Sequence, residues 1–141
     1  MKLVVDSNIV IAGLLKDGIT RSLLMEAPIE LVSPEHMLAE LRKHRPVIAR
    51  RAGLSEAEFD LLFALITERV SVVEADVYAS RLGGARDLMD ERDPGDVPFL
   101  ALALACACGI WTYNEKHFQG LGPRVWSTAE VAAWVRHASA A

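Results

Sequence analysis

Short runs of apolar residues alternate along the chain with longer stretches in which apolar residues recur at helical spacing. The short runs have the pattern of strands, several of them buried on both faces, and lie at residues 3–5, 29–32, 70–73, 110–113 and 124–126. The helical pattern covers residues 8–15, 21–25, 34–45, 59–66, 77–89, 97–108 and a last segment that begins at Thr128.

Capping residues and helix breakers set the expected boundaries of these helices. Ser33 and Pro34 have the preferences of an N-cap and of a first helical position, so they predict the start of a helix that ends before Pro46. Residues 55–58 have the capping-box pattern of a helix start. The two glycines at 83–84 indicate a weak point inside the helix at 77–89.

Strands that alternate with helices are typical of a parallel sheet enclosed by helices. We therefore expect an α/β fold, in which a five-stranded, mostly parallel sheet forms the middle of a three-layer α/β/α sandwich. The length of 141 residues is that of one ordinary domain. No repeat or linker divides the chain, so residues 1–141 are predicted to form a single domain.

Composition restricts the class of protein more than its function. Hydrophobic residues make up 52% and charged residues 24%, as in globular proteins. A net charge of −4 gives no sign of a strongly basic nucleic-acid-binding surface. An acidic metal centre can nevertheless coexist with a local basic patch, so this charge does not exclude a nuclease. Cys106 and Cys108 lie two apart in a predicted helix and point in nearly opposite directions, so we expect them neither to bridge nor to chelate together.

The apolar segments are too short for a membrane protein. The longest run, residues 97–111, is shorter than the about 20 residues that cross a bilayer. The first residues turn polar after three apolar positions, unlike a signal peptide. We expect a cytoplasmic protein without a membrane-spanning segment.

Acidic residues are predicted to gather where the parallel strands end, which is where such sheets bind ligands. Asp6 ends the first strand, and Asn114 with Glu115 follows the fourth. Glu40 lies at the margin of an apolar helix face, and Asp96 stands in front of another. A charge in front of an inward-facing apolar stripe is unusual unless something neutralises it.

A divalent cation would neutralise such a cluster. Mg²⁺ and Mn²⁺ favour oxygen ligands, activate a bound water and stabilise charge on a phosphodiester oxygen. Each acid also has a simpler interpretation: Asp6 as a turn residue, Glu40 as a solvated helix charge, and Asp93 and Asp96 as turn and N-cap residues. The order and spacing of the acids favour the metal-binding interpretation.

Basic residues follow Glu40 in the densest positive stretch of the chain: Arg42, Lys43, Arg45, Arg50 and Arg51. A nuclease would place such side chains against phosphates, whereas a solvated helix end with cations near its C-terminus is an equal alternative. The candidate substrate-binding residues are Ser7, Asn8, Arg42, Lys43 and Arg45. His44 and His117 are expected to be surface or hydrogen-bonded histidines rather than substrate contacts.

Several segments resemble the PIN-domain family of small nucleases. They are the VVDSN stretch at residues 4–8, Glu40-Leu41, the RDPGDVPFLALA stretch at residues 92–103 and the IWTYNEKHF stretch at residues 110–118. The last two are fairly specific together, whereas D-x-N alone is weak. The likeness covers nearly the whole chain.

This resemblance implies a hydrolase that cleaves RNA endonucleolytically with Mg²⁺ or Mn²⁺. The metal-binding acids would be Asp6, Glu40 and Asp96, with Asp93 assisting. Many prokaryotic members resemble the toxin of a toxin–antitoxin pair and commonly dimerise. The resemblance therefore also implies an RNA substrate, an antitoxin that inhibits the site, and a homodimer.

The fourth acidic position departs from the family pattern, which usually has an aspartate after the fourth strand. Counting back from Phe118 favours Glu115 as its equivalent, while counting forward from Thr112 favours Asn114. Glu115 would act as a longer-armed catalytic acid, whereas Asn114 would be a weaker metal ligand. The sequence leaves both open.

Other functions fit the same elements less well. A phosphatase of the haloacid-dehalogenase type wants a second aspartate two residues after the first, where this chain has Asn8. A phosphoacceptor receiver domain wants an acidic pair at the end of the first strand, where Ser7 stands. A non-catalytic RNA- or protein-binding domain of the same fold, with its chemistry lost through Asn114, remains the main alternative.

Overall fold

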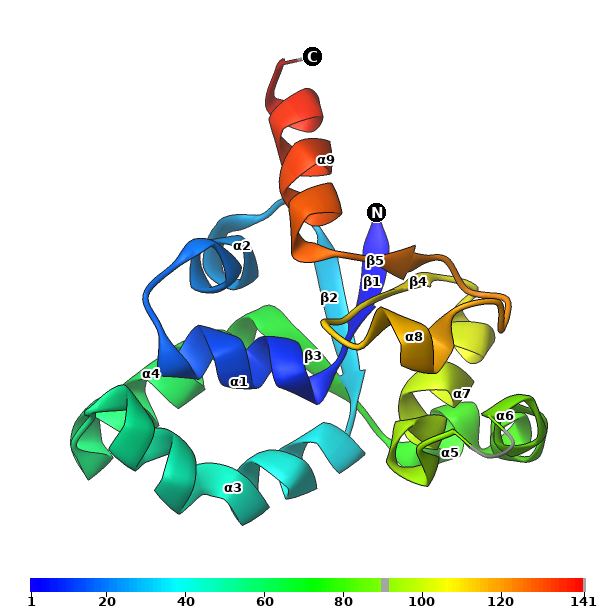
Figure 1. Cartoon of the computed structure of the whole chain (residues 1–141), viewed down its shortest axis with the longest axis horizontal. Coiled ribbons are helices and arrows are strands. Elements are labelled where there is room, and N and C mark those ends of the chain that lie inside the picture. The colour runs from blue at the N-terminus through cyan, green and yellow to red at the C-terminus, as the bar shows by residue number, and fades with distance from the viewer. Residues whose placement is uncertain (90–91, 141) are drawn as a thin grey trace.

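Five parallel strands form one sheet at the centre of the structure, a computed structural model that describes residues 1–89 and 92–140 (Figure 1). The strands are β1 (Lys2–Val5), β2 (Glu30–Pro34), β3 (Val70–Val73), β4 (Gly109–Trp111) and β5 (Val125–Trp126). Their order is β3-β2-β1-β4-β5, and each pair of neighbours is parallel. The predicted α/β fold with a five-stranded sheet is confirmed, and the sheet is entirely rather than mostly parallel.

The helices around this sheet are α1 (Ser7–Leu15), α2 (Ile19–Glu26), α3 (His36–Ala52), α4 (Glu56–Arg69), α5 (Ala75–Tyr78), α6 (Leu82–Met89), α7 (Val97–Cys106), α8 (Glu115–Phe118) and α9 (Thr128–Ala140). In Figure 1, α1 to α4 lie on one side of the strands and α5 to α7 on the other. Right-handed crossovers require this, because the chain moves from β1 outward to β3 and then returns past β1 to β4.

The sheet order reverses at β1, where ligands bind in open α/β sheets. The register pairs Val5 of β1 with Trp111 of β4, and the backbone N–H of Asp6 donates to the Trp111 carbonyl over 3.0 Å. The residues that follow β1 and β4 therefore meet at one edge of the sheet.

Helix α7 is the innermost helix and explains the nearly uniform apolar sequence after Asp96. It contacts α5, α6 and three of the five strands. Its consecutive residues Phe99, Leu100, Ala101, Leu102 and Ala103 are all buried. A helix that is buried on all sides can be apolar all round, and this one fixes the turn that precedes it against the sheet.

Two predicted boundaries of α3 are wrong. Ser33 and Pro34 belong to β2 rather than to a helix start, because Ser33 Oγ donates to the Val5 carbonyl over 2.8 Å and Pro34 pairs in register with Val73. The helix then continues through Pro46 to Ala52. Pro46 is exposed while Ile48 beyond it is buried, so tertiary packing outweighs the roughly 3 kcal/mol that an internal proline costs.

The capping box of α4 is confirmed, whereas the expected weak point in the next helical segment is misplaced. Ser55 Oγ accepts from the Glu58 backbone N–H over 3.1 Å, and Glu58 Oε1 accepts from the Ser55 N–H over 3.0 Å. The break between α5 and α6 is a 3₁₀ turn at Ala79–Arg81, and residues 83–84 lie within α6.

Helix α7 ends at Cys106, earlier than predicted, because Ala107 adopts a left-handed conformation with φ of 52°. Cys108 therefore lies outside the helix that was expected to hold both cysteines. Gly109 begins β4, and a Cβ atom there would lie 2.7 Å from Trp126 Nε1 and 2.9 Å from the Arg124 carbonyl oxygen. Close packing of β4 against β5 requires glycine at this position.

Within the described residues, every helix is too short or too polar to cross a bilayer.

Candidate metal centre

Asp6 occupies the N-cap position of α1, but its carboxylate turns toward β4 instead of capping the helix. Asp6 Oδ2 accepts a hydrogen bond from Thr112 Oγ1 over 2.7 Å, and the residue is only 4% exposed. Burial raises the pKa of Asp6 from 3.8 to about 6, opposed by the Thr112 hydrogen bond and assisted by the charges of Asp96 and Glu40. A buried carboxylate whose pKa is raised by the charges of two other carboxylates is unusual in a purely structural role.

Asp96 ends the 3₁₀ turn Pro94–Asp96 that leads into α7, and it is 8% exposed. Asp93 supports this turn, since its Oδ1 accepts from the Gly95 backbone N–H over 2.9 Å. Burial is the largest influence raising the pKa of Asp96; His117 lowers it, and the neighbouring charge of Asp93 raises it again. The turn therefore aims two carboxylates toward the same space.

Glu40 reaches the cluster from α3, one turn after the helix begins. Its Oε1 accepts from Ser7 Oγ over 3.2 Å and lies 3.2 Å from His36 Nε2. Burial raises the pKa of Glu40, His36 and the Ser7 hydrogen bond lower it, and the charges of Asp96 and Asp93 raise it further. The structure thus brings together the four predicted acids Asp6, Glu40, Asp93 and Asp96.

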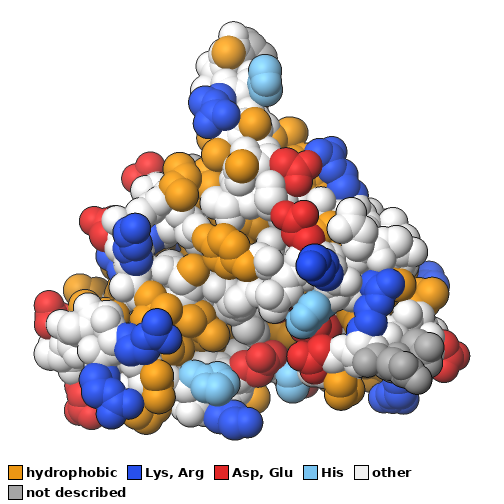
Figure 2. Space-filling model, viewed as in Figure 1, with side chains coloured by type: hydrophobic (Ala, Val, Ile, Leu, Met, Phe, Trp, Pro, Cys, Tyr) orange, Lys and Arg blue, Asp and Glu red, His pale blue; other side chains and the backbone are white. Residues whose placement is uncertain are grey.

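These four carboxylates have the chemistry of a divalent-cation site. Burial and the charges of neighbouring carboxylates raise the pKa values of Asp6, Glu40 and Asp96, so without a counter-charge protonation of these three is favoured. A divalent cation reverses that preference, and carboxylates are the ligands that Mg²⁺ and Mn²⁺ favour. Figure 2 shows acidic and histidine side chains gathered at the lower centre of the molecular face, between α3 and α8.

Ser7 and Asn8, which follow Asp6 directly, both make side-chain hydrogen bonds. Ser7 is buried and bonds Glu40. Asn8 Nδ2 donates to Thr112 Oγ1 over 3.5 Å, and Asn8 Oδ1 accepts from the Tyr113 backbone N–H over 3.3 Å. The contacts of both residues are with the acidic cluster and the loop after β4, and their predicted binding of substrate stays a prediction.

Thr112 is a member of the site that sequence reasoning missed. Its hydroxyl donates to Asp6 and accepts from Asn8 and, over 2.9 Å, from the Asn114 backbone N–H. A threonine placed directly after a buried strand, next to an acidic position, was the available signal.

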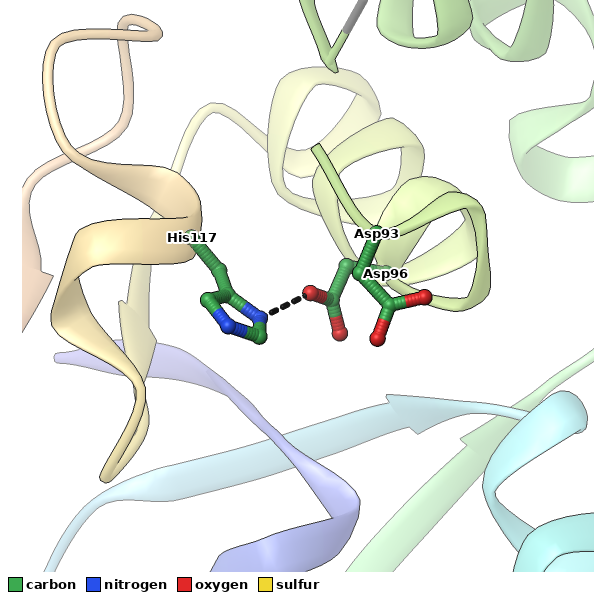
Figure 3. Close-up of side chains that lie close together, drawn as sticks. All are labelled: Asp93, Asp96 and His117. Carbon is green, nitrogen blue, oxygen red and sulfur yellow. Dashed lines mark hydrogen bonds and ion pairs between the residues drawn. The ribbon is translucent and has the colours of Figure 1, made fainter. Parts of the chain in front are cut away.

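The fourth acidic position stays a prediction for both Asn114 and Glu115. In the described part of the chain, no hydrogen bond joins the side chain of Asn114 or Glu115 to Asp6, Glu40 or Asp96, and Asn114 is exposed. Instead, His117 Nδ1 lies 2.5 Å from Asp96 Oδ2 (Figure 3). Glu115 begins the single-turn helix α8, so His117, two residues on, points about 200° away from it around the axis.

Arg92 holds α8 against the acidic turn. Its Nη1 donates to the backbone carbonyls of Lys116, His117 and Gln119 over 3.5, 3.2 and 3.0 Å. These carbonyls close a one-turn helix and lack partners within it. Since Arg92 precedes Asp93 directly, the backbones that carry His117 and Asp93 are tied together.

Three of these side chains lie close enough together to bind one metal ion. One ligand atom each from Asp93, Asp96 and His117 lies within 4.8 Å of the other two. Figure 3 shows the two carboxylates side by side at the start of α7, with the imidazole approaching from α8. His117, expected to be a surface or hydrogen-bonded histidine, is hydrogen-bonded to one of the predicted metal-binding acids, Asp96.

The sequence profile of the PIN domain matches residues 4–135. The chain belongs to the PIN domain family. A solved structure described as "Toxin-antitoxin complex from Klebsiella pneumoniae" is similar to this PIN domain, with a TM-score of 0.65 and 18% sequence identity, over 89% of this chain and 97% of that one. That likeness shows the same fold. Comparison with curated proteins gives no significant match.

The basic residues of this PIN domain are placed unequally with respect to the acids. Arg45 forms an ion pair of 2.5 Å with Asp60 and lies 4.6 Å over the Phe59 ring, so it links α3 to α4. Arg42 lines a pocket of about 640 Å³ that also includes His36, the neighbour of Glu40. Lys43 is exposed. Of the three basic residues predicted to contact substrate, Arg42 is therefore the one best placed beside the acidic centre.

Proposed function

We propose that this PIN domain is a metal-dependent endoribonuclease that uses Mg²⁺ or Mn²⁺. The observation that carries the proposal is the convergence of Asp6, Glu40 and Asp96, from three distant segments, at the edge of the sheet where its strand order reverses. Family membership and the toxin–antitoxin description of the similar structure support it.

In this proposal the chain holds its acids ready for a cation. Thr112 orients Asp6, Ser7 and His36 orient Glu40, and the Asp93 turn orients Asp96. When bound, a divalent cation activates water and stabilises charge on a phosphodiester oxygen. Arg42 binds a phosphate of the RNA in the neighbouring pocket.

We further propose that the protein is the toxin of a toxin–antitoxin pair, and that a homodimer is its functional form. An antitoxin would inhibit it by covering the acidic centre. Coexpression with the product of a neighbouring gene, followed by cleavage and binding assays, tests the antitoxin. Sedimentation of the purified chain tests the dimer.

The decisive experiment is cleavage of a mixed RNA pool by purified protein. Reactions contain Mn²⁺, Mg²⁺ or a chelator, and compare the wild type with Asp96→Asn and with Asp87→Asn. Asp87 is an exposed acid of α6 and serves as the matched control. We expect cleavage by the wild type and by Asp87→Asn, and its loss with chelator or in Asp96→Asn. Cleavage that survives in Asp96→Asn would reject the proposed site.

A non-catalytic RNA-binding domain is the second candidate, favoured by the departure at the fourth acidic position, where Asn114 and Glu115 stand in place of the usual aspartate. It predicts that folded wild-type protein binds the pool under every condition without cutting it.

A further inference from the structure

We propose that His117 is a nitrogen ligand of the metal centre, and that it makes this PIN domain select Mn²⁺ over Mg²⁺. This inference rests on the proposed metal-dependent function, because it concerns the ion that the same acids hold. It differs from the sequence expectation, in which all ligands are oxygen atoms.

The first argument is position. His117 Nδ1 lies 2.5 Å from Asp96 Oδ2, and the Asp93 carboxylate belongs to the same group of ligand atoms within 4.8 Å. Figure 3 shows the imidazole edge facing the carboxylates rather than stacking beside them. A cation held between His117 and Asp96 would take one ligand atom from each of the two side chains.

The second argument is the set of ligand atoms near Asp96. Among the described residues, the group of acidic and histidine ligand atoms that lie within 4.8 Å of one another includes His117 and does not include Glu115. The position of His117 in the single turn of α8 directs its side chain toward Asp96. Arg92 also donates a hydrogen bond to the backbone carbonyl of His117. The histidine is thus held by the backbone, independently of the cation.

The third argument is the preference of the ions themselves. Mg²⁺ demands oxygen ligands in near-ideal octahedral geometry, whereas nitrogen ligands such as imidazole suit transition metals. An imidazole that replaces a carboxylate also removes one negative charge, and Mg²⁺ relies on charge for its binding. A site that combines carboxylates with one imidazole therefore favours Mn²⁺, a transition metal that, like Mg²⁺, readily binds oxygen ligands.

The test measures metal binding without RNA. Metal-free wild-type protein is titrated with Mn²⁺ and with Mg²⁺ by calorimetry, and the Mn²⁺ complex is studied by pulsed electron paramagnetic resonance. We expect coupling of Mn²⁺ to a ¹⁴N nucleus. In His117→Asp the coupling disappears, and the ratio of Mn²⁺ to Mg²⁺ affinity falls by at least the ~10-fold that even outer-shell changes produce.

Two further variants keep the result interpretable. His117→Gln, which is neutral and adds no repulsion to the acids, loses the ¹⁴N coupling as well, so misfolding of His117→Asp cannot decide the matter. His36→Gln is the matched control, because His36 Nε2 also lies 3.2 Å from a carboxylate of the cluster. The ¹⁴N coupling persists in this variant if His117 is the ligand.

The outcomes separate this inference from the function on which it rests. Mn²⁺ that binds without ¹⁴N coupling overturns the assignment of His117 and leaves a metal-dependent nuclease intact. Coupling that is lost in His36→Gln and retained in His117→Gln assigns the nitrogen to His36 and also overturns it. Absence of any metal binding by folded protein overturns both the inference and the proposed function.

Discussion

Thr112 Oγ1 donates to Asp6 Oδ2 over 2.7 Å, and this bond joins the residue that follows β4 to the residue that follows the neighbouring strand β1. This bond lowers the pKa of the Asp6 carboxyl, which is still raised to about 6, chiefly by burial. The threonine therefore helps to keep Asp6 ionised near neutral pH, the state in which it can bind a cation.

Replacing Thr112 by valine tests this relationship. Loss of the hydroxyl raises the pKa of Asp6, so we expect Mn²⁺ affinity at pH 7 to fall by about 10–100-fold, as for other partners of metal ligands. At pH 8.5 the loss becomes smaller, because the carboxyl is ionised there in both proteins. Calorimetric titration at both pH values measures the effect, and Thr112→Ser, which keeps the hydroxyl, is the control. An equal loss at both pH values would contradict this account of Thr112.

Asp6→Asn is expected to stabilise the metal-free protein at pH 7.5. Since the pKa of Asp6 is raised on folding, its contribution to stability is full below about pH 4 and is lost as the pH rises through about 6. An uncharged isostere avoids this loss, which corresponds to roughly 2–3 kcal/mol at 1.36 kcal/mol per pKa unit.

Urea unfolding in chelator at pH 7.5 and pH 4 measures this difference. The advantage of Asp6→Asn disappears at the lower pH. With saturating Mn²⁺ its sign reverses, because only the wild type gains the stability of the bound ion. Asp87→Asn is the control for removing an exposed acid, and a similar gain in that variant would attribute the effect to net charge instead.

Gly109→Ala and Gly84→Ala form a matched pair of glycine substitutions. A Cβ atom at Gly109 would overlap Trp126 Nε1 and the Arg124 carbonyl, so we expect a loss of about 1–3 kcal/mol in the free energy of unfolding. At Gly84, within α6, no atom lies within 4 Å of the added Cβ, and we expect a gain of about 0.5–1 kcal/mol. Thermal unfolding distinguishes the two, and equal effects would refute the close approach of β4 to β5.

Arg42→Gln and Arg45→Gln should separate RNA binding from packing. In an Asp96→Asn background, Arg42→Gln is expected to weaken RNA binding and to reduce its dependence on salt by about one phosphate contact. Arg45→Gln mainly lowers the melting temperature, because Arg45 is occupied by Asp60 and Phe59. Fluorescence anisotropy at several salt concentrations provides the comparison. The reverse pattern would place the RNA on the other side of α3.

The architecture could be predicted from the sequence because the buried strands and α7 consist almost entirely of apolar residues. Leu3, Val4 and Val5 form an apolar run with no alternation, which only a strand covered on both faces requires. Local preference failed where pairing outweighed it. Ser33 and Pro34 favour a helix start by themselves, but in the chain they lie beside β1 and β3.

The candidate site could be predicted from the sequence only where the end of a strand or the start of a long helix places the residue. Asp6 and Asp96 are fixed by elements whose ends are clear in the sequence. The side chain that α8 presents depends on which residue begins a single turn of helix, and a shift of one residue changes it by about 100°. Counting from Thr112 or from Phe118 could therefore not reveal that His117 faces Asp96.

The spacing of the acids has a consequence for synthesis. Asp6, Glu40 and Asp96 come from the start of α1, from α3 and from the turn before α7, and His117 follows β4. A ribosome must therefore have translated at least as far as His117 before the complete cluster can assemble. A nascent chain that has emerged only through β3 carries Asp6 and Glu40 but lacks Asp96 and His117. The ribosome that synthesises the chain is therefore not exposed to a complete acidic cluster at that stage.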